Sequence, residues 1–180
     1  KSTKRYGSML QGHPDLKSTP GVEANTGSLG QGLSISCGIA AGLRIDGRTS
    51  RVYCVIGDGE LAEGQIWEAA MAAATFKLDN LVAILDRNGL QATGSVAQRF
   101  NTNPLPEKWR AFGWHVQEID GHDMRGILQA LEEADGIKGK PKMIIAQTIK
   151  GAGIPFAENK VEFHNGLLDA GQFETACALL

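Results

Sequence analysis

Four apolar runs rich in strand-forming residues constrain the fold of this chain more than any other feature. They cover Val52–Ile56, Leu81–Asp86, His115–Ile119 and Met143–Ile149. Each run is continuous and largely not alternating, which is typical of strands buried on both faces of a parallel sheet. The sequence therefore predicts a parallel sheet built from these four strands.

Helical patterns lie before, between and after these runs. The segment Leu61–Phe76 is rich in Ala, and its apolar residues recur at the i, i+3, i+4, i+7 spacing of a buried helical stripe. Further helices are predicted over Leu29–Leu43, Glu107–Phe112, Met124–Ala134 and, at the end of the chain, Asp169–Leu180. This alternation predicts an α/β fold in which helices cover both faces of a parallel sheet. The 180 residues suffice for one such domain, so we expect a single domain over residues 1–180.

Charge and composition exclude several classes of function. The net charge is −2 and the basic residues are scattered, so nothing favours binding to nucleic acid or to an anionic membrane. No apolar stretch approaches the roughly 18–20 residues of a membrane span, and Lys1–Arg5 lead into no apolar segment of a signal peptide. Cys37, Cys54 and Cys177 are far apart and fit no metal-ligand spacing, which favours a reducing, cytoplasmic setting.

Glycines gather in three short groups, although no segment is of low complexity. The chain has 23 glycines, well above the usual share of about 7%. They cluster within residues 27–32, 57–64 and 151–153. Glycine lets the backbone approach a ligand closely or adopt positive φ. We therefore expect several loops that face a ligand.

Polar residues follow three of the predicted strands directly. A Gly-Asp-Gly tripeptide at residues 57–59 comes after the first strand, Asn88 lies two residues beyond the second, and Lys150 begins a Gly-rich loop after the fourth. The carboxyl ends of parallel strands share the edge where open α/β sheets bind ligands. A carboxylate and an amide oxygen at neighbouring strand ends are hard ligands of the kind that Mg²⁺ prefers. The helix expected to begin near Glu60 would offer its positive end to a phosphate.

These residues resemble the signature of thiamine-diphosphate enzymes, and here 28 residues separate Gly59 from Asn88. The surrounding motifs narrow the resemblance to transketolase. They are Gly12-His13-Pro14-Asp15, Thr19-Pro20-Gly21-Val22-Glu23, Thr26-Gly27-Ser28-Leu29-Gly30-Gln31-Gly32, Glu63-Gly64 with Glu68-Ala69, and Lys150-Gly151-Ala152-Gly153 followed by His164. They occur in order over nearly the whole chain, which resembles the N-terminal subunit of transketolases that are split into two chains.

The resemblance implies a thiamine-diphosphate-binding fold and a role for each matching residue. Asp58, Asn88 and the backbone carbonyl of Leu90 would bind the metal, which is Mg²⁺ or in its place Ca²⁺ or Mn²⁺. The residues implied to contact thiamine diphosphate are Gly27, Ser28, Leu29, Gly57, Asp58, Gly59, Glu60, Asn88, Leu90, Lys150 and His164. His13 and His164 would face the sugar phosphate. Glu63, with Glu68, would contact the partner chain and couple paired active sites.

The resemblance also implies what the chain lacks. The family has a further stretch before the region that matches Lys1, and a second cofactor-binding domain whose glutamate activates the aminopyrimidine ring. We therefore expect a C-terminal partner subunit, a second copy, or both, in a homodimer or a heterotetramer. The helix Leu61–Phe76 has apolar residues on more than one face, which also predicts contact with a partner. Many members have Pro where Ser28 stands, a departure that changes little because the contact there is largely through the backbone.

The implied function is transfer of a two-carbon ketol unit from a ketose phosphate to an aldose phosphate, as in the pentose phosphate pathway. Two alternatives share the cofactor, namely a deoxyxylulose-phosphate synthase and an oxo-acid dehydrogenase component. The Gly12-His13-Pro14 and Thr19-Pro20-Gly21 segments count against both. A third alternative is a non-catalytic subunit that binds the cofactor and assembles with others. A dinucleotide site is excluded, because the glycines of residues 27–32 run G-x-x-G-x-G and follow no apolar strand.

Overall fold

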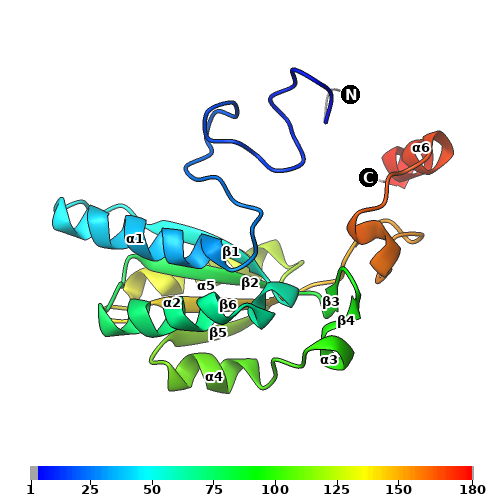
Figure 1. Cartoon of the computed structure of the whole chain (residues 1–180). Helices are drawn as coiled ribbons and strands as arrows, with labels where there is room; N and C mark the ends of the chain where they lie inside the picture. The colour runs from blue at the N-terminus through cyan, green and yellow to red at the C-terminus, as the bar shows by residue number, and fades with distance from the viewer. Residues whose placement is uncertain (1–3, 180) are drawn as a thin grey trace.

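The main sheet of the protein has four parallel strands in the order β1-β2-β6-β5 (Figure 1). The structure is a computed structural model that describes residues 4–179. The strands are Val52–Gly57 (β1), Leu81–Arg87 (β2), Lys142–Gln147 (β6) and His115–Asp120 (β5). The four predicted strands and their parallel arrangement are confirmed. Residues 1–3 of the predicted domain and Leu180 of the predicted last helix lie outside the described residues.

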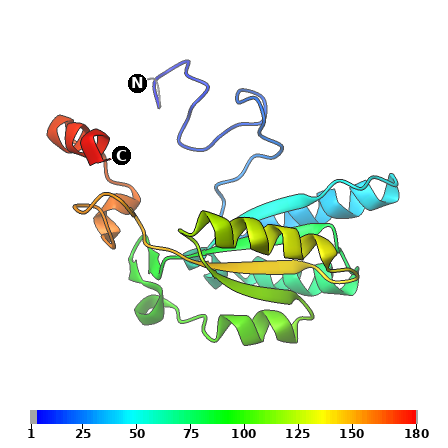
Figure 2. The ribbon, with the colours of Figure 1, turned by 180° about the vertical axis from the view of Figure 1, so that it is seen from behind.

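Helices cover both faces of this sheet, as predicted (Figures 1 and 2). On one face lie Gln31–Ile45 (α1), Gly64–Thr75 (α2) and Leu105–Ala111 (α4), and on the other lies Met124–Gly136 (α5). Successive strand residues point to opposite faces. Leu85 of β2 therefore packs with the first group of helices, while Val82 packs against α5. Each face has its own apolar core.

Among the residues that the structure describes, helices cover only one of the two faces of the edge strand β1. Cys54 and Ile56 are buried under α1 and α2. Tyr53 and Val55 point to the opposite face and are 47% and 72% exposed. The prediction that every strand is buried on both faces is thus wrong for β1, because α5 packs over β2, β6 and β5.

Three predicted helices begin two or more residues away from the predicted position. α1 begins at Gln31 rather than Leu29, because Gly30 adopts a left-handed φ of 86°. α4 begins at Leu105 rather than Glu107. The helix predicted over Leu61–Phe76 is interrupted, since a 3-10 turn covers Gly59–Ala62 (η1) and α2 begins only at Gly64. The break lies at Glu63, whose backbone is extended with φ −76° and ψ 125°.

Several short elements near the carboxyl edge of the sheet give no periodic signal in the sequence. They are the hairpin Leu90–Gln91 (β3) and Gly94–Ser95 (β4), and the turns Val96–Arg99 (α3) and Val161–His164 (η2). Elements of two to four residues are shorter than the window in which periodicity can be read. The fourth strand also ends earlier than predicted, at Gln147. The reason is that the N–H of Ile149 turns away to His122 Nε2, 2.8 Å distant.

Residues 4–30 and the last helix, Ala170–Leu179 (α6), rise on the same side of the domain (Figures 1 and 2). Residues 4–30 form no helix or strand, and they expose Tyr6, Met9 and Leu16. Within residues 4–179, no helix is long and apolar enough to cross a membrane.

Candidate cofactor and metal site

The ends of β1 and β2 bring Asp58 and the turn of Asn88 together. Gly57 pairs with Asp86 across the two strands, and the N–H of Asp58 donates to the carbonyl oxygen of Asp86 at 3.2 Å. Asp58 Oδ2 accepts the N–H of Gly89 at 2.6 Å. The predicted meeting of these two strand ends at one edge of the sheet is confirmed.

Asp58 carries a buried oxygen without a hydrogen bond to any described residue. Its side chain is 3% exposed, and the oxygen concerned is Oδ1. Burial raises the pKa of the Asp58 carboxyl, while the N–H groups of Gly89 and Gly59 act in the opposite direction. A buried acceptor left unpaired costs about 1–3 kcal/mol. A divalent cation at Oδ1 would remove this cost, so the donor fits the predicted metal.

Asn88 and Leu90 are held in a tight turn beside Asp58. Asn88 Oδ1 accepts the N–H of Leu90 at 2.9 Å, and Asn88 Nδ2 donates to Asp86 Oδ1 at 3.3 Å. Gly89 between them has a φ of +76°, which residues with a side chain rarely adopt. An amide oxygen has a second lone pair, so Asn88 Oδ1 can still accept a metal. The three residues predicted to bind the metal therefore form one connected group.

Gly59 lets the β3–β4 hairpin lie against the end of β1. A Cβ at Gly59 would lie 2.7 Å from the Cβ of Gln91, which is closer than side chains tolerate. Any other residue would push β3 away from η1 and disturb the turn that holds Asp58. Packing alone thus accounts for glycine at this position.

Glu60 links two segments that both carry predicted cofactor residues. Its Oε1 accepts the N–H of Gly30 at 2.7 Å, and its Oε2 accepts the N–H of Gly57 at 3.2 Å. These bonds join the amino end of α1 to the carboxyl end of β1. The prediction of a positive helix end near Glu60 is wrong, because η1 is a single 3-10 turn and α2 begins only at Gly64. A single turn aligns too few peptide dipoles to form such an end.

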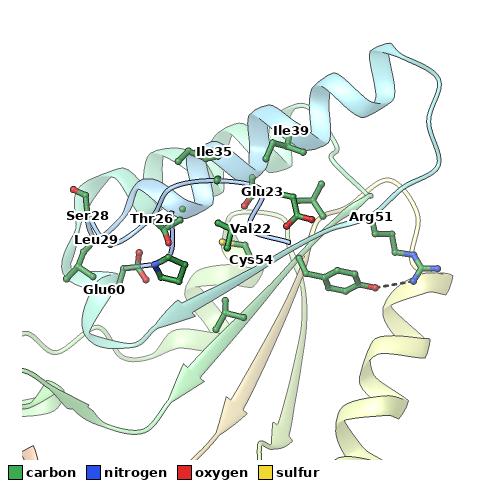
Figure 3. A pocket seen from close by; sticks show the side chains of 18 of the residues that line it. Val22, Glu23, Thr26, Ser28, Leu29, Ile35, Ile39, Arg51, Cys54 and Glu60 are labelled. Carbon is green, nitrogen blue, oxygen red and sulfur yellow. Dashed lines mark hydrogen bonds between the residues drawn. The ribbon is translucent and has the colours of Figure 1, made fainter. Parts of the chain in front are cut away.

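A groove of about 790 Å³ runs along the free edge of β1 (Figure 3). Residues 22–29 and α1 form its walls with β1, and the predicted residues Gly27, Ser28 and Leu29 line it. Glu60 lies near Leu29 at one end, and Arg51 lies at the other (Figure 3). The predicted cofactor residues therefore fall into two groups, one along this groove and one around Asp58. Glu60 connects them.

His13 lies against the first of these groups. A Cβ on Gly27 would come within 2.6 Å of His13 Nδ1, and Gly27 has a φ of +118°. The imidazole therefore rests on a position that only glycine leaves open. The structure brings the histidine predicted to face the sugar next to the segment predicted to face the cofactor.

The loop after β6 carries Lys150 and His164 back to the same edge of the sheet. The carbonyl oxygen of Lys150 accepts the N–H of Asn159 at 2.9 Å, which closes the loop. η2, which ends at His164, lies beside β3, the strand of Leu90. His164 is exposed. Its element is therefore close to Leu90, one of the residues predicted to bind the metal.

The remaining predicted residue, Glu63, lies against the amino end of α1. Its Cβ and Cγ occupy the space in front of Gly30, where an added Cβ would come within 2.9 Å. Glu63 and Glu68 are both exposed, near the start of α2. This placement leaves both carboxylates open to contact from outside the domain.

The sequence analysis missed Asp86 and Thr148, which lie inside the site. Asp86 Oδ1 accepts hydrogen bonds from Asn88 and from the hydroxyl of Thr148. The signal that could have found Asp86 is its position, because it ends the second predicted strand at the ligand-binding edge. Thr148 fell inside the strand predicted over Met143–Ile149, so its loop position was hidden.

Comparison with known proteins identifies the family. The family model described as "Transketolase, thiamine diphosphate binding domain" matches residues 1–178. The chain belongs to this family. The resemblance to transketolase is thus confirmed, and the domain is of the thiamine-diphosphate-binding kind.

Two similar proteins are subunits of bacterial transketolases. The chain is 47% identical over 176 residues to the 6-deoxy-6-sulfo-D-fructose transketolase subunit SqwG of a Clostridium species, covering 98% of this chain and 64% of that protein. It is 46% identical over 169 residues to an apulose-4-phosphate transketolase subunit of Actinobacillus succinogenes, covering 94% of this chain and 61% of that protein. The chain therefore spans less than two thirds of the length of these relatives.

Solved transketolases have the same fold. The transketolase of Pichia stipitis in complex with sedoheptulose 7-phosphate matches 97% of this chain and 27% of its own length, with a TM-score of 0.90 and 30% identity. The transketolase of Campylobacter jejuni matches 89% of this chain and 26% of its own length, with a TM-score of 0.84 and 34% identity. The predicted thiamine-diphosphate-binding fold is confirmed. The matches do not favour the two other enzyme classes that share the cofactor.

Proposed function

We propose that this transketolase domain holds thiamine diphosphate through a divalent cation, as part of an enzyme that transfers a two-carbon ketol unit between sugars. The observation that carries the proposal is the buried Oδ1 of Asp58 beside the Asn88 turn, an oxygen with no hydrogen-bond partner within residues 4–179. Family membership supports the cofactor, and the chemistry of the donors supports the metal. When bound, thiamine diphosphate supplies an electron sink for the ketol carbon.

The metal would be held by Asp58, Asn88 and the backbone carbonyl of Leu90. All three donors are oxygens, a set that suits Mg²⁺ and also Ca²⁺ or Mn²⁺. The remaining proposed contacts to the cofactor come from Gly27, Ser28, Leu29, Gly57, Gly59, Lys150 and His164. Glu60, with both oxygens bound to backbone N–H groups, would position two of these segments.

His13 and His164 would act on the sugar. His13 lies on Gly27, and His164 ends the η2 turn beside β3. Each imidazole can donate a hydrogen bond to a hydroxyl or to an oxygen that gains charge during the reaction. We therefore assign binding and charge stabilisation to these two residues.

The substrate class follows from a property that the names of two relatives share. One relative is named for a sulfo-sugar and the other for a sugar phosphate. A sulfonate and a phosphate are both anions. We propose that the substrate is a ketose that carries an anionic group, with a sugar phosphate as the first choice.

A partner is part of the proposal. The two bacterial relatives are named as subunits, and α2 exposes Met71 on the face that does not pack on the sheet. We infer association with a C-terminal transketolase half, with a second copy, or with both, as a homodimer or a heterotetramer. Glu63 and Glu68 would lie at that contact.

The three free cysteines favour a reducing compartment, the cytoplasm.

The test is a ketol-transfer assay on the purified chain with and without a matching C-terminal transketolase half, both supplied with thiamine diphosphate and Mg²⁺. We expect activity only when both halves are present. Cofactor binding without activity in any combination would favour the alternative, a non-catalytic assembly protein.

A further inference from the structure

Asp86 contacts the ends of three neighbouring strands. It lies near the end of β2 and pairs with Gly57 of β1 on one side and Ala146 of β6 on the other. Its carbonyl oxygen accepts the N–H of Asp58 at 3.2 Å. Its half-buried carboxylate accepts from Asn88 Nδ2 at 3.3 Å and from the Thr148 hydroxyl, both at Oδ1.

The bond to Asn88 selects one orientation of that amide. Asp86 Oδ1 is the acceptor of this bond, so it faces the NH₂ end of the amide and not its oxygen. The oxygen is thereby turned the other way, where it accepts the N–H of Leu90 at 2.9 Å. Without Asp86, rotation of the amide by half a turn would exchange a metal donor for an NH₂ group that repels the cation.

The bond to Thr148 ties the same carboxylate to the loop after β6. Thr148 lies two residues before Lys150, and its hydroxyl is fixed by Asp86. On its other side, Gly121 leaves room for the Thr148 methyl group, since a Cβ on Gly121 would collide with it. The N–H of Gly121 also donates to the carbonyl oxygen of Gln147 at 2.8 Å. The start of the loop that leads to Lys150 and His164 is therefore clamped between β2 and the turn after β5.

We propose that Asp86 is a positioning residue of this site, because it orients the amide of Asn88 toward the proposed metal and fixes the loop of Lys150 to the same strand end. The inference rests on the proposed function, since it concerns how a proposed metal ligand is held. Asp86 itself need not touch the metal or the cofactor.

The experiment is calorimetric titration of thiamine diphosphate at fixed Mg²⁺ into the assembled protein and its variants. Asp86→Ala removes the acceptor, and the affinity should fall about 10-fold or more, the scale of a lost bond to a charged group. Asp86→Asn keeps a neutral acceptor oxygen of the same shape. Because neutral hydrogen bonds are about half as strong, its affinity should fall only about threefold. The control is Asp46→Ala, which makes the same change at an exposed residue at the carboxyl end of α1; its affinity should match that of the wild type.

A second readout follows the amide directly. In ¹⁵N-labelled protein, the side-chain NH₂ protons of Asn88 should exchange with water faster in Asp86→Asn than in the wild type, and in Asp46→Ala at the wild-type rate. Unchanged affinity together with unchanged exchange in Asp86→Asn would overturn the role of Asp86. This test remains decisive if Asp86→Ala does not fold, because it uses the asparagine variant alone. A wild-type protein that binds no thiamine diphosphate in the presence of Mg²⁺ would instead overturn the proposed function.

Discussion

At the scale of one residue, the surroundings of Asp58 support the proposed binding of a cation at this site. Its carboxylate is buried at the end of β1, one oxygen accepts a backbone N–H, and the other has no partner among residues 4–179. Burial raises the pKa of this carboxyl. We therefore expect this residue to cost stability in the protein without a bound cation, and the proposed cation to remove that cost.

Asp58→Asn separates the effect of the buried carboxylate on stability from its effect on cofactor binding. A raised carboxyl pKa favours folding when the group is protonated, and this contribution is lost as the pH rises through the raised value. At pH 7 without metal, the unfolding temperature of the variant should thus equal or exceed that of the wild type, by up to about 5 °C. The difference should vanish below about pH 4, the ordinary range of Asp.

The same variant should bind thiamine diphosphate with Mg²⁺ about 10-fold more weakly or worse, since a charged ligand is lost. Calorimetry measures the affinity and differential scanning fluorimetry the unfolding temperature, with Asp120→Asn as the control. Undiminished affinity in Asp58→Asn would refute the metal assignment.

Glu60→Gln tests the link between α1 and β1. An amide can offer one acceptor oxygen, so only one of the two N–H groups of Gly30 and Gly57 keeps its partner. The free energy of unfolding should fall by about 1–2 kcal/mol. Urea denaturation measures it, and Glu132→Gln on the exposed face of α5 serves as the control. Equal stability of the two variants would show that Glu60 contributes no such link.

At the scale of elements, the long periodic segments were predicted and the short ones were not. The four strands and the helices α1, α2, α4 and α5 all exist, with ends shifted where Gly30 or Glu63 leaves the helical conformation. The hairpin β3–β4 and the turn η2 carry no periodicity, yet they bring Leu90 and His164 to the site. Elements too short to be predicted thus complete a site whose first residues follow predicted strands.

His164→Ala tests the loop that follows β6. A histidine at the end of η2 can donate to an oxygen that gains charge in the transition state, so its loss should lower kcat of the assembled enzyme by about 10²-fold. The affinity for thiamine diphosphate should change far less, because the proposed metal ligands Asp58 and Asn88 are unchanged. Steady-state kinetics at saturating cofactor measures this, with His115→Gln at the opposite edge of the sheet as the control. A normal kcat would mean that His164 lies outside the substrate site.

At the scale of the whole molecule, apolar surface remains open on this transketolase domain. Val55 of β1 is 72% exposed and Met71 of α2 is 49% exposed. Residues 4–30 and α6 rise from the same side of the domain and expose further apolar side chains, Tyr6 and Phe173 among them. We expect part of this exposed apolar surface to lie at a contact with another chain.

Met71→Lys tests the face of α2 as an interface. The chain should sediment as a dimer or larger species, alone or with the C-terminal half, and a charge at Met71 should weaken this association at least about 10-fold. Leu128→Lys makes the same change at an exposed position of α5, and there the association should stay unchanged. A monomeric wild-type chain that turns over a ketose phosphate unaided would contradict the expectation.

The sequence by itself determined the class of the fold, the family and the sheet edge that carries the site. These depend on apolar periodicity and on motifs such as residues 57–59, which are local in the chain. Only the tertiary structure decided which polar groups meet. Glu60 reaches Gly30 across 30 positions and Thr148 reaches Asp86 across 62. The second pair depends on the strand order β1-β2-β6-β5, which places β6 beside β2. No local pattern in the sequence encodes that order, because it results from how the helices pack on the two faces of the sheet.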